Sequence, residues 1–211
     1  MRFYFYRTPR LLKNIYRPCT WQRPDSERRI YLTFDDGPLP VATPYVLDIL
    51  NEHNAKGTFF VVGDNVKKYP SILASVIDAG NAVGNHTHNH LKGWNTIDNT
   101  YFENIKECQQ WIDSLGYSRH EKPLFRPPYG RIKLSQLATL AEEYEVIMWE
   151  ILSGDFDSNL NIESSWEALK KTKAGDIVVF HDSQKYLENV KLLLPKFLDH
   201  FSGLGYTFAA L

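Results

Sequence analysis

Cysteine is scarce in this chain of 211 residues, with only Cys19 and Cys108 present. Two thiols so far apart form neither a disulfide framework nor a metal-binding cluster, so we expect both to be reduced or buried. A charge excess is also absent, because the formal net charge is −1. This balance argues against binding to nucleic acid or to an anionic membrane through bulk charge.

Long apolar runs are absent as well. No stretch approaches the roughly 18 uninterrupted apolar residues of a membrane-spanning helix. The first residues are interrupted by Arg7, Arg10 and Lys13, and no small-residue cleavage site of a signal peptide follows. These absences predict a cytoplasmic protein without a membrane span, with unconventional export as the alternative.

The composition is that of a globular protein, with 43% hydrophobic and 23% charged residues. Residues 1–28 are basic, aromatic and proline-containing, and we expect them to form an arm packed on a single catalytic domain at 29–211. Strand and helix patterns alternate about seven times there, which predicts a parallel α/β sheet or barrel. The expected strands are 30–34, 58–62, 82–84, 124–125, 145–151, 176–180 and 206–211.

Polar residues that can bind metal or move protons follow five of these expected strands. They are Asp35 and Asp36, the segment 85–90, Arg126, the segment 153–155, and His181 with Asp182. In a parallel barrel the C-terminal ends of the strands share one face. The pattern therefore predicts one functional site at this face, whereas for the Asp-Asp pair alone a polar turn or helix cap explains the residues equally well.

The densest group of such residues is the set of three histidines within 86–90. His86 and His90 are four residues apart, so a helical turn or a tight loop places both on one side. Two imidazoles and a carboxylate are a common ligand set for catalytic zinc. The alternative is a surface histidine cluster without metal. We expect His88 to face solvent or to support the ligands.

His181 follows a buried apolar strand. A carboxylate from another strand end, Asp155, could hold it protonated near neutral pH, as a general acid requires, and Asp182 is the competing partner. Arg126 could pair with a carboxylate and keep it ionised; the alternative is an ordinary surface salt bridge.

The motifs in this order resemble those of the polysaccharide deacetylase family, the NodB-homology domain of carbohydrate esterase family four. Residues 33–37 (Thr-Phe-Asp-Asp-Gly), 86–90 (His-Thr-His-Asn-His) and 126–130 (Arg-Pro-Pro-Tyr-Gly) match three family motifs. The resemblance covers about 31–211. It implies a distorted (β/α) barrel with fewer than eight strands, in agreement with about seven expected strands.

The resemblance also implies a role for each matching residue. Asp36, His86 and His90 would bind one divalent metal ion, with zinc favoured and cobalt or another ion possible. Asp35 would be the catalytic base, oriented by Arg126. His181 would be the catalytic acid, tuned by Asp155. The backbone amide of Tyr129 would help to bind the oxyanion.

Two other motifs differ from the family pattern. Residues 152–156 keep only the second of two aspartates, Asp155, and carry Phe156 where the family has tryptophan. Val179 stands where the family has leucine, two residues before His181. Phe156 and Val179 would still form an apolar pocket for an acetyl methyl group, of altered shape. These changes affect the expected substrate preference more than the expected activity.

The resemblance implies a metal-dependent hydrolase of carbon–nitrogen bonds that removes acetyl groups from a carbohydrate. N-acetylglucosamine units of a polysaccharide or oligosaccharide are the expected substrate, because an amide leaving group needs an acid such as His181. The alternatives are an O-acetyl xylan-type esterase, a hydrolase of non-sugar amides and a non-catalytic carbohydrate-binding protein.

Overall fold

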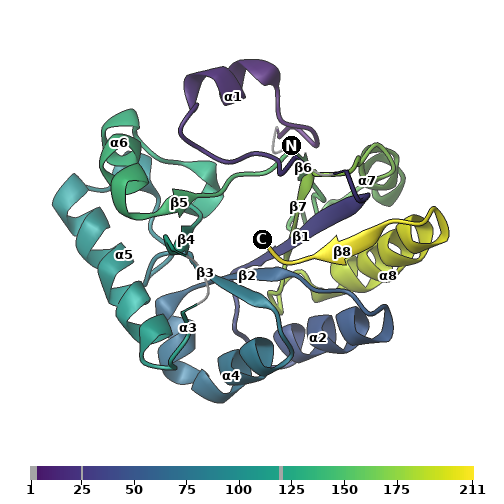
Figure 1. The fold of residues 1–211 in the computed structure, drawn as a ribbon, viewed down its shortest axis with the longest axis horizontal. Helices are drawn as coiled ribbons and strands as arrows, with labels where there is room; N and C mark the ends of the chain where they lie inside the picture. Colours follow the sequence, from purple (N-terminus) through teal and green to yellow (C-terminus); the bar gives the residue numbers. More distant parts are fainter. Residues whose placement is uncertain (1–3, 25, 119–120) are drawn as a thin grey trace.

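The computed structural model of the chain describes residues 4–24, 26–118 and 121–211. Residues 1–3 and 25 of the predicted arm lie outside this part. Strands and helices alternate along it (Figure 1). In chain order they are α1 (Arg10–Ile15), β1 (Arg29–Asp35), α2 (Ala42–Glu52), β2 (Thr58–Val61), α3 (Gly63–Lys68), α4 (Pro70–Asp78), β3 (Ala82–Asn85), η1 (Gly93–Asn95), α5 (Asp98–Asp113), β4 (Leu124–Phe125), η2 (Pro128–Gly130), α6 (Leu134–Glu143), β5 (Glu145–Val146), β6 (Ile151–Leu152), α7 (Ile162–Leu169), β7 (Ile177–His181), α8 (Leu187–Gly203) and β8 (Thr207–Ala209).

The strands form one parallel sheet in the order β5-β4-β3-β2-β1-β7-β6, and β8 pairs with the first half of β1. Figure 1 shows the sheet curled into a partial ring, with the helices from α2 to α8 around its outside. The predicted distorted (β/α) barrel of about seven parallel strands is therefore confirmed. The two ends of the curled sheet are β5 and β6, and the arm with α1 lies beside them.

Side-chain alternation along β1 explains how the barrel interior and the outer core are filled. Ile30, Leu32 and Phe34 belong to the apolar cluster that also contains the buried faces of α2 and α8. Tyr31 belongs to a separate inner cluster with residues of β2, β4 and β7. Asp35 has the same parity as Tyr31 and thus lies on the inner side at the C-terminal end of the strand.

The predicted strand at 145–151 is wrong, because this segment contains two short strands that pair with different neighbours. β5 pairs with β4 and β6 pairs with β7, so the intervening residues cross the opening of the curled sheet. The backbone of the arm pairs with this crossing: Thr20 N–H donates to the carbonyl of Val146, and Met148 N–H donates to that of Thr20, both at 2.8 Å. The arm thus forms, with the segment between β5 and β6, the backbone hydrogen bonds that a neighbouring strand would form inside a sheet.

Thr43 lies in the first turn of α2 but does not cap the helix. The N-cap position is Val41, and the Thr43 hydroxyl instead accepts a hydrogen bond from Leu39 N–H at 2.8 Å. The same hydroxyl lies 2.6 Å from a carboxylate oxygen of Asp182. Thr43 is fully buried, so it links α2 to the loop after β7.

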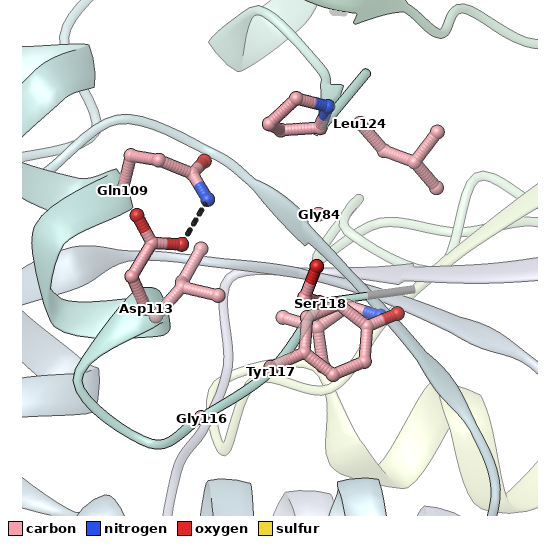
Figure 2. Close-up of a pocket in the computed structure, with 10 residues that line it drawn as sticks. Gly84, Gln109, Asp113, Gly116, Tyr117, Ser118 and Leu124 are labelled. Carbon is pink, nitrogen blue, oxygen red and sulfur yellow. Dashed lines mark hydrogen bonds between the residues drawn. The ribbon is translucent and has the colours of Figure 1, made fainter. Parts of the chain in front are cut away.

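A cavity of about 380 Å³ lies between the C-terminal part of α5 and strands β3 and β4. Figure 2 shows Gln109 and Asp113 at one side of it, joined by a hydrogen bond of 2.9 Å, with Tyr117 and Leu124 opposite. None of the predicted site residues lines this cavity. Among the described helices, none combines the length and the apolar character that crossing a bilayer requires.

Candidate active site

The predicted site residues gather at the C-terminal ends of neighbouring strands. Asp35 ends β1 and is paired in register with His181, which ends β7. Strand β3 leads directly into His86, and β4 leads directly into Arg126. Since β1, β2, β3 and β4 are parallel neighbours, these residues lie on one rim of the barrel.

Asp36, His86 and His90 form the cluster of potential metal ligands among the described residues. One ligand atom from each lies within 4.8 Å of the ligand atoms of the other two. The closest pair is His90 Nε2 and Asp36 Oδ1 at 3.2 Å, and His86 Nε2 lies 3.9 Å from the same oxygen. The His86 side chain is 2% exposed, whereas those of Asp36 and His90 are 21% and 27% exposed. The cluster is therefore open to solvent on one side.

The protonation of His86 is fixed by its surroundings. Its Nδ1–H donates to the carbonyl oxygen of Arg126 at 2.8 Å, which leaves Nε2 as the nitrogen facing Asp36. Burial lowers the pKa of His86 to about 4. At neutral pH the ring is therefore neutral, which is the form that binds metal.

Asp36 is the anionic member of the cluster. Burial favours its neutral form, but the hydrogen bond to His90 and the charge of His181 outweigh this, so the pKa of Asp36 lies well below its usual range. A carboxylate and two imidazoles within reach of one point, on an open rim, make up the donor set of catalytic zinc sites. The residues present therefore fit a divalent cation.

Arg126 is fully buried and is held in one orientation by several acceptors. Its Nη1 donates to Asp35 Oδ1 and to the Thr33 hydroxyl, both at 2.7 Å, and its Nη2 donates to the carbonyl of Met148 at 3.0 Å. The second oxygen of Asp35 lies 3.9 Å from His86 Nε2. The salt bridge to Arg126 thus orients Asp35 with one oxygen at the edge of the metal-ligand cluster.

His181 is paired with Asp155. Its Nδ1–H and its backbone N–H each donate to one carboxylate oxygen of Asp155 at 2.7 Å. The Ser153 hydroxyl donates to the same carboxylate at 2.8 Å. Burial disfavours the charged ring, but the nearby charge of Asp155 and its hydrogen bond raise the pKa of His181 to about 10. The imidazole is therefore protonated at neutral pH, with Nε2–H remaining for transfer.

Asp182, the other possible partner of His181, has a different position. Its Oδ1 accepts a hydrogen bond from Gly37 N–H at 2.9 Å, and its Oδ2 lies 2.6 Å from the Thr43 hydroxyl. Burial raises the pKa of Asp182 to about 8. A side chain at Gly37 would collide with this carboxylate, because an added Cβ would lie 2.0 Å from Asp182 Oδ2. Asp182 thus holds the turn that follows the two aspartates.

The three predicted substrate-binding residues differ in exposure. Tyr129 is 58% exposed, and the centre of its ring lies 4.7 Å from that of His90. Phe156 is half-buried, with its ring centre 5.4 Å from that of His181. Val179 is 1% exposed and lies on the inner side of β7, two residues before His181. Aromatic rings thus flank both the metal-ligand cluster and the expected acid.

The backbone near the site adopts left-handed conformations that the sequence did not indicate. Asp36, Thr87, His90 and Tyr129 have φ angles of 87°, 63°, 55° and 61°. Such angles are uncommon for residues other than glycine and occur most often where function constrains the chain. Four such residues on one rim show that the loops turn sharply to bring their side chains together.

Asn104 on α5 is a supporting residue that we did not predict. Its side-chain oxygen accepts hydrogen bonds from His88 N–H at 2.9 Å and Asn89 N–H at 3.0 Å, so it holds the loop between His86 and His90, the two potential ligands. The available signal was a polar residue beside Ile105 on the apolar face of the helix. Of the two expectations for His88, the solvent-facing position is wrong, because His88 is 6% exposed and its Nε2 lies 3.2 Å from Glu107 Oε1. A role in supporting the ligands stays a prediction.

Comparisons with known proteins agree with the geometry. The family model described as polysaccharide deacetylase matches residues 22–147. A peptidoglycan-N-acetylglucosamine deacetylase of Bacillus cereus is 35% identical over 196 residues, which cover 90% of this chain and 89% of the relative. A chitooligosaccharide deacetylase of Azorhizobium caulinodans is 33% identical over 162 residues, 74% of this chain and 75% of the relative.

A solved peptidoglycan N-acetylglucosamine deacetylase, in complex with 4-naphthalen-1-yl-N-oxidanyl-benzamide, has the same fold. It superposes with a TM-score of 0.85 at 26% sequence identity, covering 97% of this chain and 95% of that chain. The family model, the curated relatives and the solved fold lead to one conclusion. The chain belongs to the polysaccharide deacetylase family, as its motifs predict.

Proposed function

We propose that this protein is a metal-dependent deacetylase that removes the acetyl group from N-acetylglucosamine units of a polysaccharide or oligosaccharide. The observation that carries the proposal is that three potential ligand atoms lie within 4.8 Å of one another. Beside them lie two groups that can transfer protons, a carboxylate and an imidazole, each held by a partner of opposite charge. Asp35 is held by Arg126, and His181 is held by Asp155. The curated relatives include deacetylases named for peptidoglycan and for chitooligosaccharides.

Asp36, His86 and His90 would hold the cation. The chemistry that a bound divalent cation supplies is positive charge, which polarises an acyl oxygen and makes a water molecule easier to deprotonate. Asp35 accepts the proton of the attacking water, since Arg126 fixes one of its oxygens and leaves the other at the edge of the cluster. The backbone N–H of Tyr129 stabilises the developing oxyanion, a contribution of about 3 kcal/mol for a well-placed donor.

His181 donates a proton to the leaving amine. An amine leaves poorly as an anion, so cleavage of an amide depends on such an acid. The Asp155 carboxylate keeps the ring protonated at neutral pH and fixes its orientation through Nδ1. The carboxylate of Asp35 and the protonated ring of His181 can then act as base and acid in one turnover. This division of roles favours N-acetyl over O-acetyl substrates.

Release of acetate from chitooligosaccharides and peptidoglycan fragments tests the proposal. We expect release by zinc-loaded protein, loss of release with a chelator, and recovery on adding the metal back. Asp35→Asn should still fold and bind zinc but lose turnover by about 100-fold or more. Asp48→Asn, on the exposed face of α2, is the matched control and should be unchanged. Release from acetylated xylan alone would contradict the N-acetyl assignment, and no release from any acetylated sugar would contradict the proposal.

A further inference from the structure

Residues 4–8 of the arm extend the sheet at its β6 edge. Arg7 forms an antiparallel bridge with Ile151. Leu152 N–H donates to the Tyr6 carbonyl at 2.8 Å, and Thr8 N–H donates to the Glu150 carbonyl at 2.9 Å. These hydrogen bonds fix the register of the arm relative to β6. Residues 4–6 therefore lie beside the loop that follows β6, which carries Asp155 and Phe156.

Two tyrosines of this segment pack against that loop. The ring centre of Tyr4 lies 5.0 Å from that of Phe156 and 5.2 Å from that of Tyr6. Gly154 has φ +80°, and a Cβ added to it would lie 2.9 Å from the Tyr6 ring and 3.0 Å from the Tyr4 hydroxyl. The two rings therefore approach the loop backbone as closely as glycine permits.

A continuous set of contacts joins the arm to the expected catalytic acid. Tyr4 packs on Phe156, and Phe156 packs edge-on against His181 with 5.4 Å between ring centres. Both tyrosines are half-buried. Without the arm, Phe156 would lose its ring contact with Tyr4. The rotamer of Phe156 would then be less restricted, because a half-buried ring is held by its neighbours.

We propose that Tyr4, supported by Tyr6, is a specificity-determining positioning residue that backs Phe156 as one wall of the acyl pocket. This inference rests on the proposed function and on the expectation that Phe156 borders the pocket for the acetyl methyl group. Phe156 is smaller than the tryptophan typical of the family at this position, and the Tyr4 ring lies against it. The arm thus contributes to the active site from a distant part of the sequence.

The test compares N-acetyl and N-propionyl chitobiose as substrates of the full-length, zinc-loaded protein. A rigid apolar pocket discriminates against one extra methylene by about 10- to 200-fold. We expect Tyr4→Ala to lower the acetyl-to-propionyl ratio of kcat/KM by about 10-fold, because the Phe156 ring can then move away from the larger acyl group. Tyr4→Phe keeps the ring and should retain the ratio of the unmodified protein.

Controls separate this role from a general loss of structure. Leu11→Ala, on an exposed position of α1, should leave the ratio unchanged. The Tyr4→Ala and Phe156→Ala changes should be non-additive in a double-mutant cycle on the ratio, because both act through one wall. If Tyr4→Ala folds poorly, Tyr6→Ala is measured in the same way, with zinc affinity as the check on the remaining site.

The outcomes distinguish this inference from the proposed function. An active unmodified protein whose acetyl-to-propionyl ratio is the same in Tyr4→Ala and Tyr6→Ala would overturn the inference and leave the deacetylase assignment standing. Additive effects in the cycle would also overturn it. Absence of deacetylation by the unmodified protein would instead reject the proposed function.

Discussion

The pairing of His181 with Asp155 predicts a specific pH dependence. In the proposed mechanism His181 acts as the acid and must be protonated, so activity falls as the pH rises through its pKa, which the carboxylate raises to about 10. Asp155→Asn removes the negative charge and should move the alkaline limb of kcat/KM to lower pH by about 1 to 3 units. The measurement is the pH profile of acetate release by zinc-loaded protein.

A second His–Asp pair supplies the control for this prediction. His53 and Asp199 lie 3.0 Å apart at the surface, where the carboxylate side chain is 76% exposed. Asp199→Asn removes the same charge from the same kind of pair but should leave the pH profile unchanged. An alkaline limb at the same pH in Asp155→Asn and in the unmodified protein would show that Asp155 does not set the protonation of His181.

At the scale of single residues, the sequence indicated which side chains meet but not how they are held. Strand ends marked by Asp35, His86 and His181 were recognisable because parallel strands place their C-terminal ends together. The choice between Asp155 and Asp182 as partner of His181 was open. Successive residues leaving a strand point in opposite directions, and only the structure shows that Asp182 turns toward Gly37 instead.

At the scale of elements, the arm is fixed by ion pairs with buried carboxylates. Arg7 contacts Glu150 at 2.5 Å and Asp176 at 2.9 Å, and these two carboxylate side chains are 3% and 0% exposed. Arg7→Met leaves them without this partner and should lower the free energy of unfolding by about 2 to 3 kcal/mol, less than for a fully buried pair because Arg7 is 37% exposed. Urea denaturation measures the change.

The neighbouring Arg10 provides a matched control. It is exposed at the start of α1, and Arg10→Met should change the free energy of unfolding by less than about 0.5 kcal/mol, as is usual for surface substitutions. Equal effects of the two substitutions would show that the ion pairs of Arg7 do not stabilise the arm. A loss of stability in Arg7→Met with a normal acetyl-to-propionyl ratio would separate arm docking from pocket shape.

The elements themselves were predictable where their hydrogen bonds are local. Helices such as α5 and α8 have apolar residues at helical spacing, and Pro70 begins α4 just after α3 ends. The segment 145–151 could not be divided correctly from its sequence. Its residues pair with β4, with the arm and with β7 in turn, and these partners lie far away along the chain.

At the scale of the whole molecule, the barrel was predictable from the alternation of strands and helices, whereas its closure was not. The sheet ends at β5 and β6, and the arm lies across the opening through bridges at Thr20 and Arg7. An arm of irregular structure carries no periodic pattern that would reveal such pairing. Its contacts make the N-terminal segment part of the folded unit that carries the site.

The convergence of two loops on one cluster of potential ligands predicts that zinc stabilises the whole domain. The cluster joins the loops after β1 and β3, which are about 50 residues apart in the sequence. A ligand that binds only the folded state at 100 times its Kd adds about 2.7 kcal/mol, which corresponds to a rise in Tm of about 5 to 10 °C for a domain of this size. Calorimetry of chelated protein with and without added zinc measures the shift.

Removal of one ligand tests whether this cluster is the origin of the shift. His90→Ala leaves Asp36 and His86 in place and should abolish most of the rise in Tm, because two ligands hold the ion much less tightly than three. His53→Ala, which removes a histidine at the C-terminal end of α2 that is paired with Asp199, should retain the full rise. A zinc-dependent rise that survives His90→Ala would place the cation elsewhere and separate metal binding from the proposed chemistry.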